Sequence, residues 1–243
     1  MASWSSSRLS WGDAGRDLLL GTACLGCGAP GRTLCAACDA SLPRRGRPAW
    51  PVPTPTGLAP PFSGGDYEGL LKALVNAHKE RGAYALSAPL GRVLGDVLRS
   101  LLEAADWPPG APVSLVPVPS HAAVVRRRGH DPLLRIARAA ATRLRSHGVD
   151  ATVARLLVAA AAVQDQAALT AVQRATNLRG SMRSGRWREA PAGALVIVDD
   201  VLTTGSTARE AQRALEAAGG SVLGIATPAA TRRRSATSGD GRP

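Results

Sequence analysis

Two adjacent aspartates followed by a run of hydroxyl side chains form the strongest candidate site in this sequence. Asp199 and Asp200 come directly after the apolar run Ala194–Val198, which predicts a buried strand of a parallel sheet. Residues 208–218 favour a helix, which Ser206 or Thr207 could cap. In open α/β sheets, ligands bind where a strand ends and the next helix begins. The loop at this point contains Thr203, Thr204, Gly205, Ser206 and Thr207.

The chemistry of this segment suits a phosphorylated sugar. Backbone N–H groups at the start of a helix can hold a phosphate, and Gly205 permits its close approach. Asp199 and Asp200 can accept hydrogen bonds from the vicinal hydroxyls of a ribose, so a ribose 5-phosphate satisfies both halves of the motif. A P-loop NTPase is excluded because neither Lys72 nor Lys79 lies in a G-x-x-x-x-G-K-[ST] loop. A phospho-receiver domain would place its paired acids near the amino terminus. The structural alternative is a capped helix after an acidic strand end.

All four cysteines lie within fifteen residues, as Cys24, Cys27, Cys35 and Cys38 in the pattern C-x2-C-x7-C-x2-C. Two C-x2-C pairs supply the four thiolates of a tetrahedral Zn²⁺ site. The alternative is a set of redox pairs or free thiols, since disulfides are uncommon in cytoplasmic proteins. Four cysteines would leave no open position on the metal, so zinc here would be structural or serve docking.

Positive charge is concentrated in one part of the chain. Residues 120–190 contain thirteen arginines and four acids, a balance of +9 within a whole-chain charge of +12. A generally arginine-rich composition explains why the chain has only two lysines, but not this clustering. The cluster favours an anionic ligand, either a polyphosphate or a nucleic acid.

Hydrophobic patterning predicts helices and strands that alternate, as in a parallel sheet covered by helices on both faces. Predicted helices lie in two segments within 67–102 and at 131–147, with strands at 113–118, 151–158 and 221–227 besides Ala194–Val198. The Arg-rich segment 159–193 is a candidate flexible segment. The predicted organisation is a loose N-terminus (1–20), a four-cysteine module (21–42), a Pro/Gly-rich linker with little regular structure (43–65), an α/β domain (66–230) and a disordered tail (231–243).

The sequence predicts a cytoplasmic protein without membrane insertion. Its longest apolar run, Leu156–Val163, is far shorter than the roughly 20 residues that cross a bilayer. The segment DLLLGTACLGC near the start contains Asp17 and lacks the apolar core of a signal peptide.

The segment VIVDDVLTTGST resembles the phosphoribosyl pyrophosphate (PRPP) motif of type I phosphoribosyltransferases. The chain as a whole is similar to the ComF competence-protein family, from its cysteine pairs to about Thr227. Four further fragments support this resemblance by their order and spacing: YEGLLKALVNAHKERG, VPVPSH, RRRG and QAALTAVQRATNLRGSM. The resemblance implies a type I phosphoribosyltransferase-like fold with an N-terminal zinc module.

The resemblance also implies roles for individual residues. Asp199 and Asp200 would bind the ribose 2′- and 3′-hydroxyls, and the hydroxyl-rich loop would hold the 5′-phosphate. Arg174 and Asn177 would belong to a hood that closes over the substrate and excludes water. The pyrophosphate loop would be Val118, Pro119, Ser120 and His121, with Mg²⁺ and the side chains of Arg126, Arg127 and Arg128 neutralising the leaving group.

The implied activity is a pentosyl transfer, in which an unknown nitrogen acceptor displaces pyrophosphate from ribose C1. Where the family has Arg-Gly-aromatic-Asn-Gln, this chain has His130, Asp131 and Pro132 after Arg128-Gly129, and Met182 replaces another aromatic residue. We expect Pro132 to begin a helix that Asp131 caps. His121 and His130 are candidate general bases, although a histidine beside a loop is more often structural.

Two further hypotheses remain beside the transferase. The chain could bind PRPP as a regulator without turnover. It could also serve DNA uptake or recombination, with its zinc module and arginines contacting single-stranded DNA or a protein partner. Its few aromatic residues, 3% of the chain, weaken the case for base stacking on single strands.

Overall fold

The chain forms a mixed α/β structure around one mostly parallel sheet, as the sequence predicts. The computed structural model describes residues 23–120, 131–159, 180–185 and 193–231. The strands pair in parallel except at one edge, where β1 runs antiparallel to β2. Along the sheet the order is β1 (Arg47–Pro48), β2 (Pro61–Asp66), β9 (Val222–Ala230), β7 (Ala194–Val198), β3 (Val113–Pro117) and β4 (Ala151–Val153), with β8 (Val201–Leu202) paired to β9.

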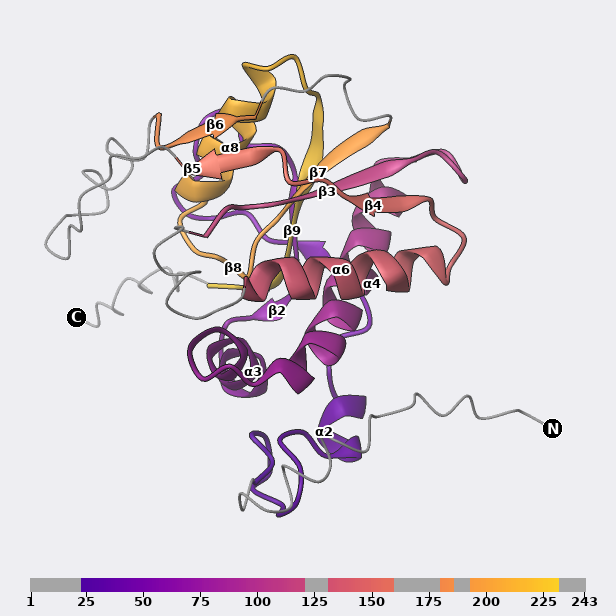
Figure 1. The fold of residues 1–243 in the computed structure, drawn as a ribbon, viewed down its shortest axis with the longest axis vertical. Helices are drawn as coiled ribbons and strands as arrows, with labels where there is room; N and C mark the ends of the chain where they lie inside the picture. Colours follow the sequence, from indigo (N-terminus) through magenta and orange to yellow (C-terminus); the bar gives the residue numbers. More distant parts are fainter. Residues whose placement is uncertain (1–22, 121–130, 160–179, 186–192, 232–243) are drawn as a thin grey trace, which may run out of the picture.

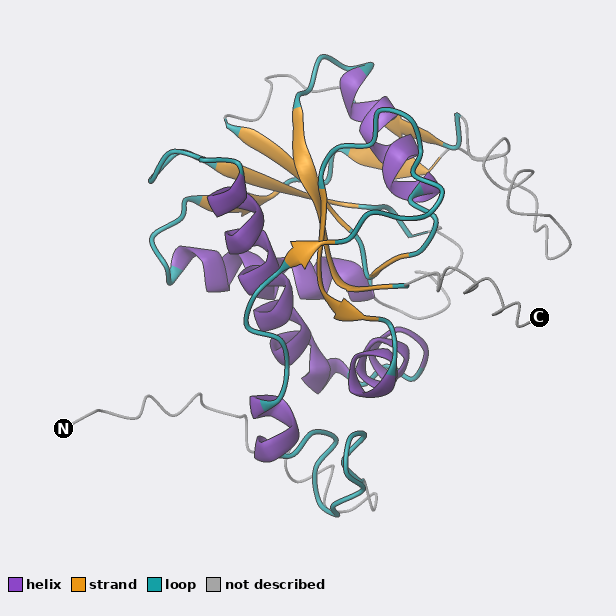
Figure 2. Ribbon diagram, turned by 180° about the vertical axis from the view of Figure 1, so that it is seen from behind, coloured by secondary structure: helices purple, strands orange, loops and turns teal. Residues whose placement is uncertain are grey.

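Helices cover both faces of this sheet (Figures 1 and 2). Side chains of β7 alternate, so that Val196 and Val198 pack into one core, and Leu195 and Ile197 into the other. The first face is covered by α3 (Gly69–Glu80), α4 (Ser87–Ala104) and α6 (Pro132–Arg145), with the short 3-10 helix η1 (Tyr84–Leu86) between α3 and α4. The second face is covered by α8 (Ser206–Glu216) and by a hairpin of β5 (Leu157–Ala159) and β6 (Met182–Ser184).

Local sequence explains how α6 begins and how it packs. Asp131 caps the helix by accepting a hydrogen bond from the backbone N–H of Leu134 at 3.2 Å, and Pro132 occupies its first position, as predicted. On α4, a Cβ at Gly91 would lie only 2.3 Å from the Cβ of Ala139, so the glycine lets α4 and α6 approach closely.

The structure corrects the expected lack of regular structure between residues 43 and 65. Strands β1 and β2 lie in this segment, and β2 is an integral strand of the main sheet. Its sequence PFSGGD has little strand propensity, but it pairs along its length with β9. A Cβ at Gly64 would lie 2.7 Å from Val93 Cγ1 and 2.8 Å from the oxygen of Pro228, so the glycine allows tight packing at this place.

The predicted strand 151–158 is also different in the structure. It divides into β4, which joins the main sheet, and β5, which pairs with β6 in a separate antiparallel hairpin. The terminal segments 1–22 and 232–243 lie outside the described residues, as does most of the candidate flexible segment. Within the described part of the chain, none of the helices combines the length and apolar character needed to cross a bilayer.

Candidate functional site

A cavity of about 620 Å³ opens at the carboxyl edge of the parallel sheet. Strands β3 and β7 are neighbours there, with Pro117 paired to Val198, and the backbone N–H of Val118 donates to the oxygen of Val198 at 3.0 Å. The two loops that follow these strands therefore begin side by side. Such a crevice at strand ends is the common ligand site of open α/β sheets.

Seven of the predicted site residues line this cavity, although they come from two segments that lie far apart in sequence. Thr204, Gly205 and Ser206 belong to the predicted hydroxyl-rich loop but do not line the cavity. His121, Arg126, Arg127, Arg128, Arg174 and Asn177 lie outside the described residues, as does His130. The seven lining residues are Val118, Pro119, Ser120, Asp199, Asp200, Thr203 and Thr207.

The loop before α8 has a backbone shape suited to an anion. Gly205 adopts a left-handed conformation with φ of 74° at the N-cap of α8, and a Cβ there would lie 3.0 Å from Pro51 Cγ. Neither Ser206 nor Thr207 caps the helix, contrary to expectation, and the cap has no side-chain hydrogen bond. The N–H of Ser206 donates to Thr204 Oγ1 at 3.4 Å, but Gly205 has no side chain to cap the first turn, and the helix dipole favours negative charge at this end.

The aspartate pair includes an internal counter-ion. Lys79 Nζ lies 2.7 Å from Asp200 Oδ2, and Asp199 Oδ1 accepts a hydrogen bond from the backbone N–H of Asp200 at 2.8 Å. Burial, followed by the negative charge of Asp200, raises the pKa of Asp199 to about 7. Burial alone would lower the pKa of Lys79, but the charge of Asp200 outweighs it and the pKa is raised. Near neutral pH the carboxyl of Asp199 is therefore close to its titration midpoint.

The sequence analysis assigned no role to Lys79, which it quoted only within a motif. Lys79 comes from α3, together with Val75 and Asn76, and these side chains line the cavity from one helix face. Asn76 and Val75 precede Lys79 by three and four residues, and this spacing could have predicted from the sequence that the three side chains share one helix face. Nothing in the sequence indicated that this face lies opposite an acid 121 positions away, at Asp200.

The four cysteines form a compact cluster that could hold a metal ion such as zinc. Their sulfur atoms all lie within 4.8 Å of one another. The backbone N–H of Cys35 donates to Cys24 Sγ at 3.3 Å, and the backbone N–H of Cys38 to Cys35 Sγ at 3.5 Å. Metal-binding cysteines are thiolates, so N–H groups that point at sulfur assist binding.

The thiols of Cys24 and Cys38 differ in acidity because their hydrogen-bond partners differ. Burial would raise the pKa of Cys24, but backbone hydrogen bonds, that of Cys27 foremost, outweigh burial and lower it to about 6. The pKa of Cys38 is raised to about 12, first by its interaction with the Cys35 thiol. Four thiolates at this distance repel one another, so full ionisation needs a cation in their midst.

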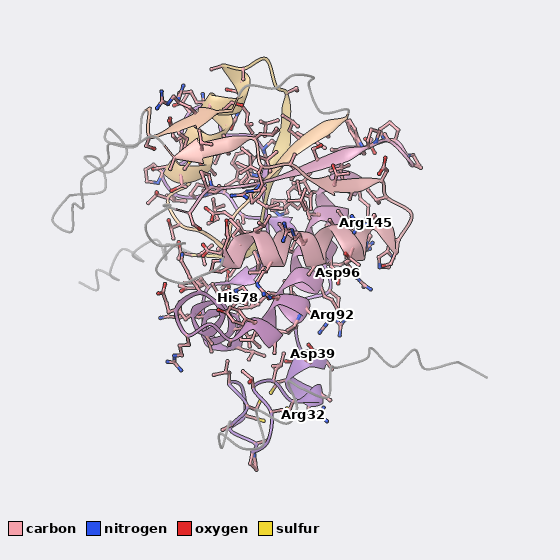
Figure 3. The ribbon with its side chains drawn as sticks, in the orientation of Figure 1. Arg32, Asp39, His78, Arg92, Asp96 and Arg145 are labelled. Atoms are coloured by element: carbon pink, nitrogen blue, oxygen red, sulfur yellow. The ribbon has the colours of Figure 1, made fainter. Side chains whose placement is uncertain are left out.

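The cysteine module is attached to the α3–α4 side of the main domain. Leu25 and Leu34 pack against the hydrophobic core on that side. Asp39, on α2 (Ala36–Ala40), forms an ion pair with Arg92 on α4, and Figure 3 shows the two side chains at the junction. Among the described residues, the module is therefore held by apolar contacts and by the ion pair of Asp39 with Arg92.

No protein-family model matches the chain, and no curated protein matches it significantly. The function must therefore be inferred from the cavity and from the cysteine cluster. The cavity combines a helix start suited to an anion, an acidic pair and a lysine. Together these groups suit a ligand that has a phosphate and vicinal hydroxyls.

Proposed function

We propose that this protein binds PRPP with Mg²⁺ in the cavity at the carboxyl edge of its sheet. The observation that carries the proposal is the convergence of two segments there, one after β3 and one that runs from the end of β7 past β8 to the start of α8. A mainly parallel sheet with helices on both faces supports a type I phosphoribosyltransferase fold. The chain's resemblance to the ComF family points to the same substrate.

Each part of PRPP has a suitable counterpart in the cavity. The 5′-phosphate would lie at the start of α8, where Gly205 lets the loop turn tightly and the N–H groups have no side-chain cap. Asp199 and Asp200 would accept hydrogen bonds from the ribose hydroxyls. The pyrophosphate would lie against the loop of Val118, Pro119 and Ser120.

The charge of the described lining explains why a cation must accompany the substrate. Asp199, Asp200 and Glu80 outnumber Lys79, which is the one basic residue among the described side chains that line the cavity. A polyanion entering this lining needs positive charge, and Mg²⁺ binds phosphate oxygens together with carboxylates and water. When bound, Mg²⁺ would stabilise the charge that develops on the departing pyrophosphate.

We further propose that the bound PRPP undergoes pentosyl transfer. The bond from C1 to the pyrophosphate oxygen breaks, pyrophosphate leaves with the bonding electrons, and an acceptor nitrogen forms a bond to C1 and gives its proton to water. Asp199 and Asp200 hold the ring and lie near the positive charge that develops on the sugar. Asp131 takes no part in acceptor binding in this scheme, because its carboxylate caps α6.

The metal of the cysteine cluster is proposed to be structural zinc. Four sulfur ligands in two C-x2-C pairs are the donor set that zinc prefers, and they leave no open position for substrate. Both the reduced thiols that zinc binding needs and the expected substrate favour a cytoplasmic protein.

Calorimetric titration with PRPP, with and without Mg²⁺, tests the proposed site. The wild-type protein should bind PRPP with a requirement for magnesium, and the Asp199→Asn/Asp200→Asn double variant should bind at least about 100-fold more weakly, since two hydrogen bonds to charged groups are lost. Well-folded wild-type protein that does not bind PRPP would refute the proposal.

A second candidate function, binding of single-stranded DNA, is favoured by the exposed face of α6. Arg135, Arg138 and Arg145 are exposed there, and α6 contains no acidic residue. Phosphate contacts make nucleic-acid affinity fall with salt, by about one unit of logarithmic slope for each contact. Arg138→Ala should reduce that slope by about one, whereas an affinity that does not depend on salt would exclude this function.

A further inference from the structure

The connection between β1 and β2, residues 49–60, is a part of the fold to which the proposed binding of PRPP assigns no role. Antiparallel neighbours such as β1 and β2 can be joined by a tight turn of about two residues. Here twelve residues join them, although the backbone N–H of Ala49 donates to the oxygen of Pro61 at 2.9 Å and holds the two ends together. Between these ends the chain leaves the sheet and runs beside α8 (Figures 1 and 2). We call this connection the strap.

The strap packs against the hydroxyl-rich loop at the start of α8. A Cβ at Gly205 would lie 3.0 Å from Pro51 Cγ and 3.3 Å from Leu58 Cδ2. It would also lie 3.4 Å from Pro55 Cδ, so three strap side chains surround the left-handed residue of the loop. These three side chains are not among those that line the cavity. The strap therefore contacts the loop without reaching a ligand in the cavity.

A buried side chain of α8 fixes the backbone of the strap. Gln212 is 5% exposed, and its Nε2 donates to the oxygen of Gly57 at 2.9 Å. Its Oε1 accepts a hydrogen bond from the backbone N–H of Ala59 at 2.8 Å. Nε2 also donates to Glu216 Oε1 at 2.7 Å, and this carboxylate sets which end of the amide faces Gly57. One side chain thus satisfies a donor and an acceptor of a segment that belongs to no helix or strand.

Two further contacts attach the strap to α8. Arg209 Nε donates to the backbone oxygen of Thr56 at 3.0 Å. Leu58 and Ala59 belong to the same apolar core as Ala208 in the first turn of the helix. Helix α8 therefore begins at the proposed phosphate site and holds, further along, the segment that packs on that site.

The strap restricts a loop that has little internal restraint. Glycine loses more conformational freedom on folding than any other residue, and the N-cap of α8 at Gly205 has no side-chain hydrogen bond. In the strap, by contrast, Pro51, Pro53 and Pro55 have a φ fixed by their rings. Thr54 Oγ1 also donates to the oxygen of Pro51 at 2.7 Å. A stiff segment against a flexible loop reduces the ordering that a ligand must cause, and this strengthens binding.

We propose that the strap is the positioning element of the phosphate site: it holds the hydroxyl-rich loop in a shape suited to an anion, and Gln212 holds the strap. The identity of the anion as the 5′-phosphate of PRPP rests on the proposed function. The positioning itself rests on the packing around Gly205 and on the hydrogen bonds of Gln212.

Separate titrations of the full-length protein with ribose 5-phosphate and with magnesium pyrophosphate test this inference. Gln212→Met keeps an unbranched side chain but removes both hydrogen bonds to the strap. It should weaken binding of ribose 5-phosphate about 10-fold, as expected for a coupling between neighbouring sites. Binding of magnesium pyrophosphate should stay within about 2-fold, because that group is proposed to lie against the loop after β3.

Ser63→Ala is the matched control for a loss of stability. Ser63 is 1% exposed in β2, and its hydroxyl also pairs with a backbone oxygen and a backbone N–H, both of Gly65. The change removes buried hydrogen bonds outside the strap, so it should lower the melting temperature but leave the affinity for ribose 5-phosphate within about 2-fold. If Gln212→Met also lowered the melting temperature without weakening ribose 5-phosphate, its role would be structural only and the inference would be overturned.

Hydrogen exchange supplies a second readout. Because coupling between two sites is reciprocal, ribose 5-phosphate should slow exchange of the Ala59 N–H in wild-type protein. The Gln212→Met variant should lose this slowing, and magnesium pyrophosphate should not cause it. Exchange at Ala59 that is the same with and without saturating ribose 5-phosphate would refute the coupling.

The outcomes separate this inference from the proposed function. Wild-type protein that binds PRPP, with a Gln212→Met variant that binds ribose 5-phosphate equally well, overturns the inference and leaves the proposed function standing. Wild-type protein that binds inorganic phosphate but not PRPP refutes the proposed function, whereas a dependence of phosphate binding on Gln212 would still support the positioning role. Wild-type protein that binds neither overturns both.

Discussion

The cysteine cluster and the aspartate pair both bring acidic groups together, but their charge is balanced in different ways. At the aspartate pair, Lys79 lies 2.7 Å from Asp200 and supplies a positive charge from the chain itself. In the cysteine cluster, the hydrogen bonds to sulfur that the structure describes come from backbone N–H groups and from other thiols. The carboxylates therefore have a counter-ion in the folded chain, whereas the four thiols need a metal to ionise together.

This difference implies that the cysteine cluster and the aspartate pair are coupled to folding in different ways. A cluster that depends on a metal folds with the metal, because its ligands repel one another without it. A pair that has its own counter-ion keeps its shape and responds instead to pH and to substrate. The predictions below test this contrast, beginning with the largest expected effect.

Loss of the metal should unfold the cysteine module and spare the cavity. The wild-type protein should contain about one zinc per chain, and Cys24→Ser/Cys35→Ser should contain none, as metal analysis would show. Structural zinc contributes about 10–16 kcal/mol in isolated zinc-finger peptides, so amide exchange at residues 24–38 should rise by orders of magnitude. Exchange in α6 should stay unchanged. If metal-free wild-type protein kept slow amide exchange in the cysteine module, the cluster would not depend on a metal and the contrast with the aspartate pair would be wrong.

Removal of the internal counter-ion should make PRPP binding depend more strongly on magnesium. Lys79→Met leaves the carboxylates without their cation, so PRPP affinity at low Mg²⁺ should fall about 10-fold, with part of the loss recovered at high Mg²⁺. Lys72→Met is the matched control, because Lys72 lies on the same helix over the ring of Tyr67 and does not line the cavity. Equal titration curves for the two variants would contradict a role for Lys79.

The raised pKa of Asp199 should make stability depend on pH. Its pKa rises from 3.8 to about 7, so the folded state keeps a proton that the unfolded state releases. Stability therefore falls as the pH rises from about 4 through 7. Asp199→Asn should remove this loss and stabilise the protein by on the order of 1 kcal/mol at pH 8, with little effect at pH 4. Denaturant unfolding of wild type and variant at pH 4 and pH 8 measures the stabilisation at each pH. Equal stabilisation at the two pH values would contradict a raised pKa for Asp199.

The ion pair at the junction should have the smallest effect. Asp39 and Arg92 are each about one-third exposed, at 33%, and such pairs contribute about 0.2–1 kcal/mol. Arg92→Ala should keep zinc and slightly increase amide exchange in the module. Arg99→Ala, which breaks a pair with Glu103 within α4, should not. Identical exchange in the two variants would assign the docking of the module to apolar contacts alone.

Local patterns in the sequence predicted several elements within a few residues. The apolar run of β7 and the amphipathic pattern of α6 appear as expected, and Asp131 caps α6. Strand β2 was missed, because its glycines give little local preference for a strand. It forms because β9 offers a partner and because Gly64 lets β2 pack against Val93.

The candidate site also has parts that local sequence predicts and parts that depend on residues far away in the chain. The aspartates and the hydroxyl-rich loop could be selected from one short segment, and Asp199, Asp200, Thr203 and Thr207 line the cavity. The pairing of Lys79 and the attachment of the backbone around Ser181 could not be predicted, because each joins residues that are far apart in sequence. Lys79 meets Asp200 across the sheet edge, and Glu210 fixes the backbone on both sides of Ser181.

By itself, the sequence determined what depends on near neighbours in the chain. Cysteine spacing, a helix cap and an acidic strand end are set by backbone geometry over a few residues. Only the tertiary structure decided which segments share the cavity, because strand order and helix packing are set by burial over the whole core. The pairing of Lys79 with Asp200 and the attachment of the backbone around Ser181 to α8 both follow from that packing.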